Sequence, residues 1–177
     1  MDVKIKELTE RKDILETVRI YIESIREDHS FKPGSYINAL NSEEEYEDFE
    51  KWRESDKEFN NVFGAFIDDD LVGYISTGKT SIDDDEIKGE ITGFFVRKGL
   101  RKKGIGTKLL TVAADFLKEK GYDTILIYNF KRSSSNEYYR KMGGKVVHRE
   151  IQEIGDMELE VEVFEFKISD LLSGKKF

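Results

Sequence analysis

The sequence predicts a mixed α/β fold, an α+β arrangement in which a mostly antiparallel sheet contains one strand–helix–strand crossover. Segments that alternate apolar and polar residues, as half-buried strands do, fill the middle and the end of the chain. Amphipathic helical patterns follow the first strand, and a glycine-bearing basic turn joins a strand to a helix further on. With 177 residues, of which 38% are hydrophobic, residues 1–177 are expected to form a single domain around one core.

The first half of the chain is expected to contain one strand, two helices and then three strands. Residues 3–8 alternate as a strand does, and residues 9–27 carry apolar side chains at three- and four-residue steps, which predicts a helix. A second helix is expected over residues 43–55, with Ser42 and Glu45 as its capping box. The three strands, separated by aspartate-rich turns, are expected at residues 62–67, 71–77 and 86–96.

The second half is expected to contain a crossover helix, a strand, a helix and two strands. Residues 107–120 carry an apolar helical face that ends at Gly121, a residue type that commonly terminates helices. Residues 124–128 form a continuously apolar strand, which predicts a central position covered on both faces. Ser134 and Glu137 predict a capping box at the start of the last helix. The final strands are expected at residues 145–153 and 158–167.

Composition excludes several classes of function. A net charge of −8 disfavours nucleic-acid binding and favours cationic partners. Because the chain has no cysteine, disulfides, thiolate metal sites and a cysteine nucleophile are excluded. No apolar run has membrane-spanning length and no signal-peptide pattern opens the chain, so we expect a cytoplasmic protein with no membrane partner. The acidic segment 43–50 is interpreted as a solvated helix face in preference to a rim that attracts an amine.

The stretch 93–110 predicts an anion-binding turn. An apolar run ending at Val96 leads into a basic turn, and Gly104 and Gly106 follow where a helix begins. The unpaired N–H groups and the dipole of a helix N-terminus, approached over glycines, suit a diphosphate. The spacing matches neither the P-loop nor the dinucleotide-binding fingerprint. Taken alone, this stretch leaves a phosphate site and a plain structural turn open.

Two motifs resemble the GNAT superfamily of acyl-CoA-dependent N-acetyltransferases. After Phe95 and Val96, residues 101–106 read R-K-K-G-I-G, which is similar to the family signature [Arg/Gln]-x-x-Gly-x-[Gly/Ala]. Residues 138–144 read Y-Y-R-K-M-G-G and match the second signature, Phe/Tyr-Tyr-x-Lys-x-Gly-[Phe/Gly]. The element order fits the family over nearly the whole chain. The resemblance implies a GNAT-like β-α-α-β-β-β-α-β-α-β-β fold with a central splayed pair of parallel strands.

The resemblance also implies acetyl-CoA as co-substrate and no metal. Backbone N–H groups of the basic turn would hold the pyrophosphate, and the preceding strand would pair with the pantetheine arm. Ser135 stands where the family often has alanine and is expected to contact the cofactor, whereas Arg132 replaces the usual asparagine. The cofactor-binding residues implied in this way are Phe94, Phe95, Val96, Arg101, Lys102, Lys103, Gly104, Ile105, Gly106, Thr107 and Ser135.

Acyl transfer needs a base for the amine and a proton for the departing thiolate. By resemblance, Tyr139 is the tyrosine that protonates the sulfur, and Tyr138 is expected to pack in the core. Glu90 is the candidate general base, although an exposed polar position on an alternating strand explains it equally well. Glu86 is a weaker candidate, and Thr92 could hold a water in place of a direct base.

The resemblance therefore implies an N-acetyltransferase that acts on a primary amine by direct attack in a ternary complex. The acidic segments favour a cationic small molecule as the acceptor. A protein N-terminus or lysine, a non-catalytic CoA-binding regulatory module, and a nucleotide-binding protein of another kind are the alternatives. The final strands could pair across a two-fold axis, so a homodimer and a monomer are both left open.

Overall fold

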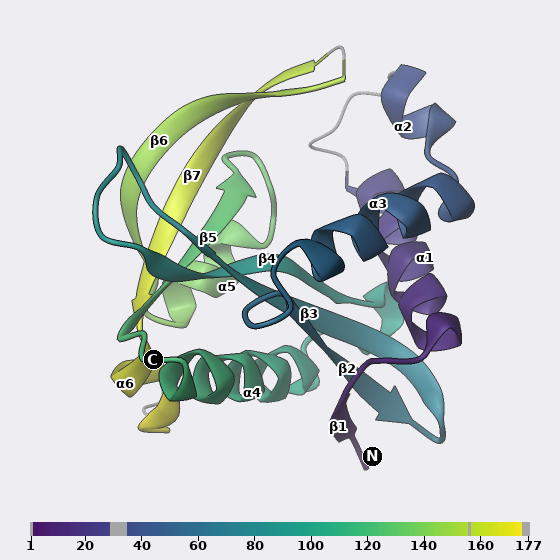
Figure 1. Ribbon diagram of the computed structural model, residues 1–177, viewed down its shortest axis with the longest axis horizontal. Coiled ribbons are helices and arrows are strands. Elements are labelled where there is room, and N and C mark those ends of the chain that lie inside the picture. The colour runs from purple at the N-terminus through teal and green to yellow at the C-terminus, as the bar shows by residue number, and fades with distance from the viewer. Residues whose placement is uncertain (1, 29–34, 156, 175–177) are drawn as a thin grey trace.

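Figure 1 shows the computed structural model of the chain, which describes residues 2–28, 35–155 and 157–174. Within these ranges, seven strands form one sheet in the order β1-β2-β3-β4-β5-β7-β6. Every neighbouring pair is antiparallel except β4 and β5, which are parallel and central. The expected fold class is therefore confirmed. The strands are β1 (Lys4–Glu7), β2 (Asn61–Ile67), β3 (Asp70–Thr80), β4 (Lys88–Val96), β5 (Thr124–Phe130), β6 (Lys145–Ile154) and β7 (Met157–Lys167).

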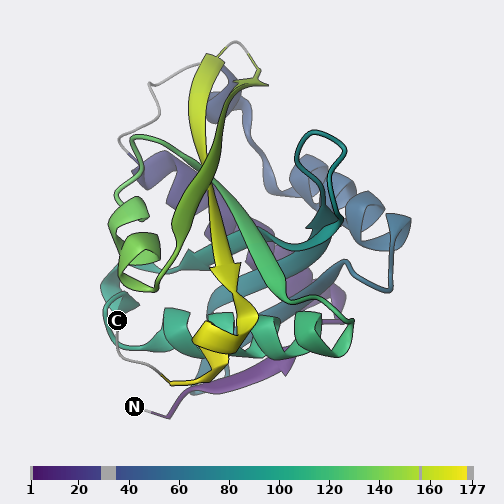
Figure 2. The ribbon, with the colours of Figure 1, turned by 90° about the vertical axis from the view of Figure 1, so that its left-hand side faces the viewer.

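The helices cover both faces of the sheet (Figures 1 and 2). α4 and α6 pack on one face and α1 and α3 on the other. Two short helices, α2 and α6, are absent from the expected element order, because five residues are too few to display a helical period. The helices are α1 (Arg11–Glu27), α2 (Ser35–Ala39), α3 (Ser42–Ser55), α4 (Ile105–Glu119), α5 (Asn136–Lys141) and α6 (Ile168–Leu172), with a 3-10 turn, η1, at Lys98–Leu100.

Each face of the sheet has its own apolar core. On the α4 face, Leu109 and Leu117 are fully buried against strand residues such as Ile91 and Ile125. On the opposite face, Ile14 of α1 packs in a second cluster with apolar residues of β2 and β3. Fully burying one such side chain contributes about 1.5–3 kcal/mol, so these clusters hold the helices firmly on the sheet.

The central strands share only a short paired segment. β4 and β5 are in register from Gly89 opposite Ile125 to Ile91 opposite Ile127. Beyond Ile91, β4 remains paired with β3 alone, and β5 remains paired with β7 alone. A shift in the β3–β4 register at Thr77 falls at this same point. The two strands then leave their common segment in different directions (Figure 1), which opens the middle of the sheet.

The structure corrects two predicted helix caps. Asn41, not Ser42, caps α3, because its side-chain oxygen accepts a hydrogen bond from Glu44 N at 3.0 Å. α5 is preceded by Ser135 rather than Ser134, and the Ser135 side chain makes no capping bond. The expected aspartate turn between β2 and β3 is confirmed, since Asp68 and Asp69 adopt positive φ angles of 49° and 69°. Among the described helices, none combines the length and the apolar character needed to cross a membrane.

Candidate active site

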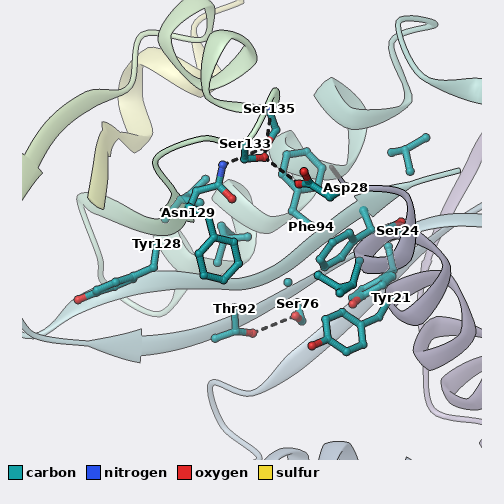
Figure 3. Close-up of a pocket in the computed structure, with 18 of the residues that line it drawn as sticks. Tyr21, Ser24, Asp28, Ser76, Thr92, Phe94, Tyr128, Asn129, Ser133 and Ser135 are labelled. Atoms are coloured by element: carbon teal, nitrogen blue, oxygen red, sulfur yellow. Dashed lines mark hydrogen bonds between the residues drawn. The ribbon is translucent and has the colours of Figure 1, made fainter. Parts of the chain in front are cut away.

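A cavity of about 1850 Å³ opens where β4 and β5 separate. Its walls come from β4, β5, α5 and the turn before α4, and, on the other side, from α1, α3 and the hairpin of β6 and β7. Figure 3 shows some of the side chains that line this cavity, among them Ser76 and Thr92, whose hydroxyls are hydrogen-bonded at 2.9 Å. The separation of two strands inside one sheet thus creates a space bordered by unpaired backbone.

The first turn of α4 leaves backbone N–H groups unpaired at the edge of this cavity. Arg101 Nε donates to Val96 O at 2.7 Å and so closes the turn. Gly104 adopts a left-handed φ of 82°, and the first helical bond of α4 runs from Lys108 N to Gly104 O at 3.1 Å. The three N–H groups at residues 105–107 precede that bond and have no backbone acceptor within the described residues. This arrangement fits a diphosphate of the kind coenzyme A carries.

Most predicted cofactor residues line this cavity. Phe94, Phe95, Val96, Arg101, Lys102, Gly104, Gly106, Thr107 and Ser135 contribute to its wall. The side chains of Lys103 and Ile105 do not: Lys103 is exposed, and Ile105 is buried in the core beneath α4. Those two residues can therefore contribute only their backbone groups.

Glu90 lies at the end of the paired segment of β4, opposite Leu126. Its neighbours Gly89 and Ile91 face α4, so strand alternation directs the Glu90 side chain to the other face, where it lines the cavity. Burial there raises the pKa of its carboxyl to about 7. Glu86 is exposed, precedes β4 and does not line the cavity. Of the two glutamates considered, only Glu90 is near the opening between the strands.

Tyr138 and Tyr139 both reach the cavity, and Phe94 packs against both rings. Tyr139 is 5% exposed and also packs on Phe164 and Phe166. Burial, helped by the neighbouring Tyr138 hydroxyl, raises the pKa of Tyr139 well above its ordinary value, and a hydrogen bond with Ser135 opposes this only in part. Burial also raises the pKa of Tyr138. Packing is therefore common to both tyrosines, and the expected role of Tyr139 remains a prediction.

The opposite side of the cavity combines aromatic rings with carboxylates. Glu45 and Asp48 project from α3, and burial, together with the charges of Asp48 and Glu44, raises the pKa of Glu45. Glu43, Glu44 and Glu47 are exposed, so the acidic segment is solvated in part and borders the cavity in part. Other residues that line the cavity and that the sequence did not single out are Tyr21, Phe49, Trp52, Tyr128, Phe130, Glu150 and Met157, which come from α1, α3, β5 and the β6–β7 hairpin.

The chain matches the family model "Acetyltransferase (GNAT) family" over residues 22–143. It belongs to this family. The family assignment makes the chain an acyl-CoA-dependent acetyltransferase, which confirms the predicted family and enzyme class. Within the described residues, no group of three His, Cys, Asp or Glu side chains is arranged to hold a metal ion.

Known proteins agree with this assignment. The N-acetyltransferase YuaI of Bacillus subtilis (strain 168) is 24% identical over 153 residues, which cover 83% of each chain. The structure of yncA from Salmonella typhimurium, solved with its cofactor acetyl-CoA, has a TM-score of 0.69 at 16% identity and 94% coverage of both chains. PaiA N-acetyltransferase from Thermoplasma acidophilum, solved with coenzyme A, has a TM-score of 0.67 at 20% identity, covering 94% of this chain and 99% of that one. These likenesses support the GNAT fold.

Proposed function

We propose that this acetyltransferase moves the acetyl group of acetyl-CoA to a primary amine of a cationic small molecule, by direct attack in a ternary complex. The observation that carries the proposal is the position of Glu90. Its half-buried carboxyl, with a pKa of about 7, lines the same cavity as the first turn of α4, with its unpaired N–H groups, and the Tyr139 ring. Base, anion site and proton donor thus border one space.

Acetyl-CoA, when bound, supplies a thioester whose acetyl carbon accepts the amine. The N–H groups at residues 105–107 have the position and polarity to hold its pyrophosphate. The backbone of β4 beyond Ile91 lacks a partner on the β5 side, so it can hydrogen-bond the amides of the pantetheine arm. Its N–H groups near Phe95 would be candidates for stabilising the oxyanion that forms.

Glu90 would remove a proton from the acceptor. An ammonium group cannot attack a thioester, and a carboxylate with a pKa of about 7 is ionised in about half of the molecules at neutral pH. Such a base is considerably stronger than an ordinary glutamate, whose pKa is about 4.3. Tyr139, protonated at neutral pH because burial raises its pKa, would supply the proton that the departing thiolate takes up.

The acceptor side of the cavity favours a cation. Glu45, Asp48 and Glu150 bring negative charge to the wall, and Tyr21, Phe49 and Trp52 bring aromatic rings. Carboxylates attract an ammonium group over a distance, and aromatic faces bind cations directly. These features support a small amine that carries further positive charge.

Release of free CoA from acetyl-CoA in the presence of a panel of amines tests the proposal. The panel contains polyamines, aminoglycosides, a peptide with a free N-terminus and a peptide with a blocked N-terminus and one lysine. We expect the polycationic small molecules to give the highest kcat/KM. A preference for either peptide would identify a protein N-terminus or a lysine as the acceptor. If no amine caused release of CoA, the result would contradict the proposed reaction.

A further inference from the structure

Strand β6 forms one edge of the sheet and has a partner on one side only. β7 is its single neighbour in the strand order of the described residues. Figure 1 shows β6 along the outer edge of the sheet, at the upper left. With ten residues, β6 is longer than a typical strand. The backbone N–H and C=O groups that point away from β7 can therefore pair with a further strand.

The part of β6 that is regular enough for such pairing is residues 148–154. A shift in register between Val146 and His148 marks a bulge near the start of the strand. Bulges are one means by which proteins prevent pairing at a sheet edge. From His148 to Ile154, however, each residue lies opposite one residue of β7 without interruption. No proline or glycine occurs in this segment, so it presents a regular edge.

An apolar side chain is exposed in the middle of this segment. Ile151 is 67% exposed, and Ile87 and Val147 are the other large apolar residues that are exposed among those described. Two of the three thus belong to β6. A surface that covers Ile151 would remove the most exposed of these side chains from water, which is favourable.

The two faces of residues 148–154 have different surroundings. Glu150 and Gln152 line the cavity, so strand alternation directs Arg149, Ile151 and Glu153 to the outer face. All three of these side chains are exposed. The outer face therefore carries a positive charge, an apolar side chain and a negative charge at two-residue intervals.

This order of side chains is complementary to itself. When two antiparallel copies of one strand pair across a two-fold axis, one residue lies opposite its own copy. With Ile151 at that position, isoleucine meets isoleucine, and Arg149 of each copy lies opposite Glu153 of the other. With Arg149, Glu150 or Glu153 at the axis, two like charges would lie opposite each other. Apolar and opposite-charge pairs stabilise a sheet, whereas like charges destabilise it.

Arg149 is held in place before any such pairing. Its Nε and Nη2 donate to Glu162 Oε1 at 3.3 and 3.2 Å, and the buried Glu162 also accepts from Arg140. The Arg149 side chain nevertheless remains 65% exposed. Because a guanidinium has five N–H donors, Arg149 can bind a second carboxylate without releasing the first. Its fixed position lowers the entropy cost of pairing.

We propose that the outer edge of β6 binds a second copy of this chain, with the two β6 strands antiparallel and Ile151 at the two-fold axis. The sheets of the two copies would join into one, with an ion pair between Arg149 and Glu153 on each side of the axis. The second copy would also brace the hairpin whose inner face lines the cavity. This pairing does not depend on the proposed reaction, because Glu90 and Tyr139 lie in the cavity of a single chain.

Sedimentation equilibrium of the full chain over the micromolar range tests this interface, and we expect a dimer. Ile151→Lys places two like charges at the axis and should raise the dimer Kd about a hundredfold. Ile87→Lys, the same change at an exposed isoleucine outside β6, is the matched control and should leave the Kd unchanged. Glu153→Lys should raise the Kd about tenfold, whereas Glu119→Lys, at an exposed position of α4, should not.

A cysteine crosslink reports the register, because the native chain has no cysteine. The Cα atoms of directly opposed residues in antiparallel strands lie about 4.5–5.5 Å apart, which a disulfide can span. Ile151→Cys should therefore form a disulfide-linked dimer on mild oxidation. Glu153→Cys should not, because position 153 of the second copy would lie about 13 Å away along the strand.

Three outcomes overturn this interface. They are a native chain that stays monomeric at every concentration, a dimer that persists in Ile151→Lys, and a crosslink that forms as readily in Glu153→Cys as in Ile151→Cys. Release of CoA, measured on the same samples, separates this result from the proposed function. A native dimer that releases no CoA with any amine would contradict the proposed reaction and leave the interface standing.

Discussion

The two sides of the cavity are built from different parts of the chain. The side next to α4 offers unpaired backbone groups: N–H groups at residues 105–107, which follow the left-handed Gly104, and the unpaired edge of β4. The side next to α1 and α3 consists of side chains that converge from distant segments, such as Tyr21, Phe49 and Glu150. A backbone site suits a co-substrate common to a family, whereas a side-chain site can change with the acceptor.

The same contrast explains what the sequence could predict. The basic turn with its glycines and the tyrosine pair are short contiguous motifs, so their position in the fold followed from local pattern. The acceptor side has no such motif, because residues as far apart as Tyr21 and Glu150 border the same cavity only once the sheet has placed β6 and α1. No helical or strand periodicity in the sequence indicates that these two residues lie near one cavity.

The largest loss of activity is expected on substitution of Glu90, which lies between the two sides of the cavity. Glu90→Gln removes the base and should lower kcat/KM about a hundredfold or more, because proton transfer typically contributes two to four orders of magnitude. The matched control is Glu86→Gln, which neutralises an exposed glutamate outside the cavity. Steady-state kinetics that show equal losses in the two variants would remove Glu90 from the mechanism.

An intermediate effect is expected at the backbone side. Gly104→Ala places a Cβ on a residue with φ 82°, which costs about 1–2 kcal/mol for an L-residue and favours relaxation of the turn. We expect calorimetry to show acetyl-CoA binding weakened by up to about tenfold, because 1.4 kcal/mol corresponds to a factor of ten. Gly99→Ala is the control, since its added Cβ meets nothing and its φ is not positive. Equal binding by both variants would argue against a backbone site.

The smallest effect is expected at the acceptor side. Glu45→Gln and Asp48→Asn each remove one charge near solvent, so we expect KM for a polycationic amine to rise about two- to fivefold. The rise should shrink at high salt, because exposed charges are screened, and KM for acetyl-CoA should stay constant. Glu47→Gln, on the same helix but outside the cavity, is the control. An equal rise in that variant would point to general surface charge.

Two short sequence patterns, the capping box before α3 and the tyrosine pair, did not identify the role of each residue in them. Ser42 and Glu45 satisfy the capping-box pattern, but Asn41 stands one residue earlier and is an equally good cap, so the pattern cannot choose between them. Tyr138 and Tyr139 share one motif, and sequence separates a packing role from a chemical one only by analogy. Burial of both rings in one aromatic cluster depends on Phe164 and Phe166, which come from a strand 25 or more residues later.

The pH dependence of kcat/KM for the native enzyme and Glu90→Gln tests the central claim most directly. Below its pKa, Glu90 is protonated and cannot accept a proton; above it, the carboxylate is available. Since burial raises that pKa to about 7, the native kcat/KM should rise with pH through an apparent pKa near 7, and this step should be absent from Glu90→Gln. A native profile without that step, or one that Glu90→Gln retains, would contradict the account.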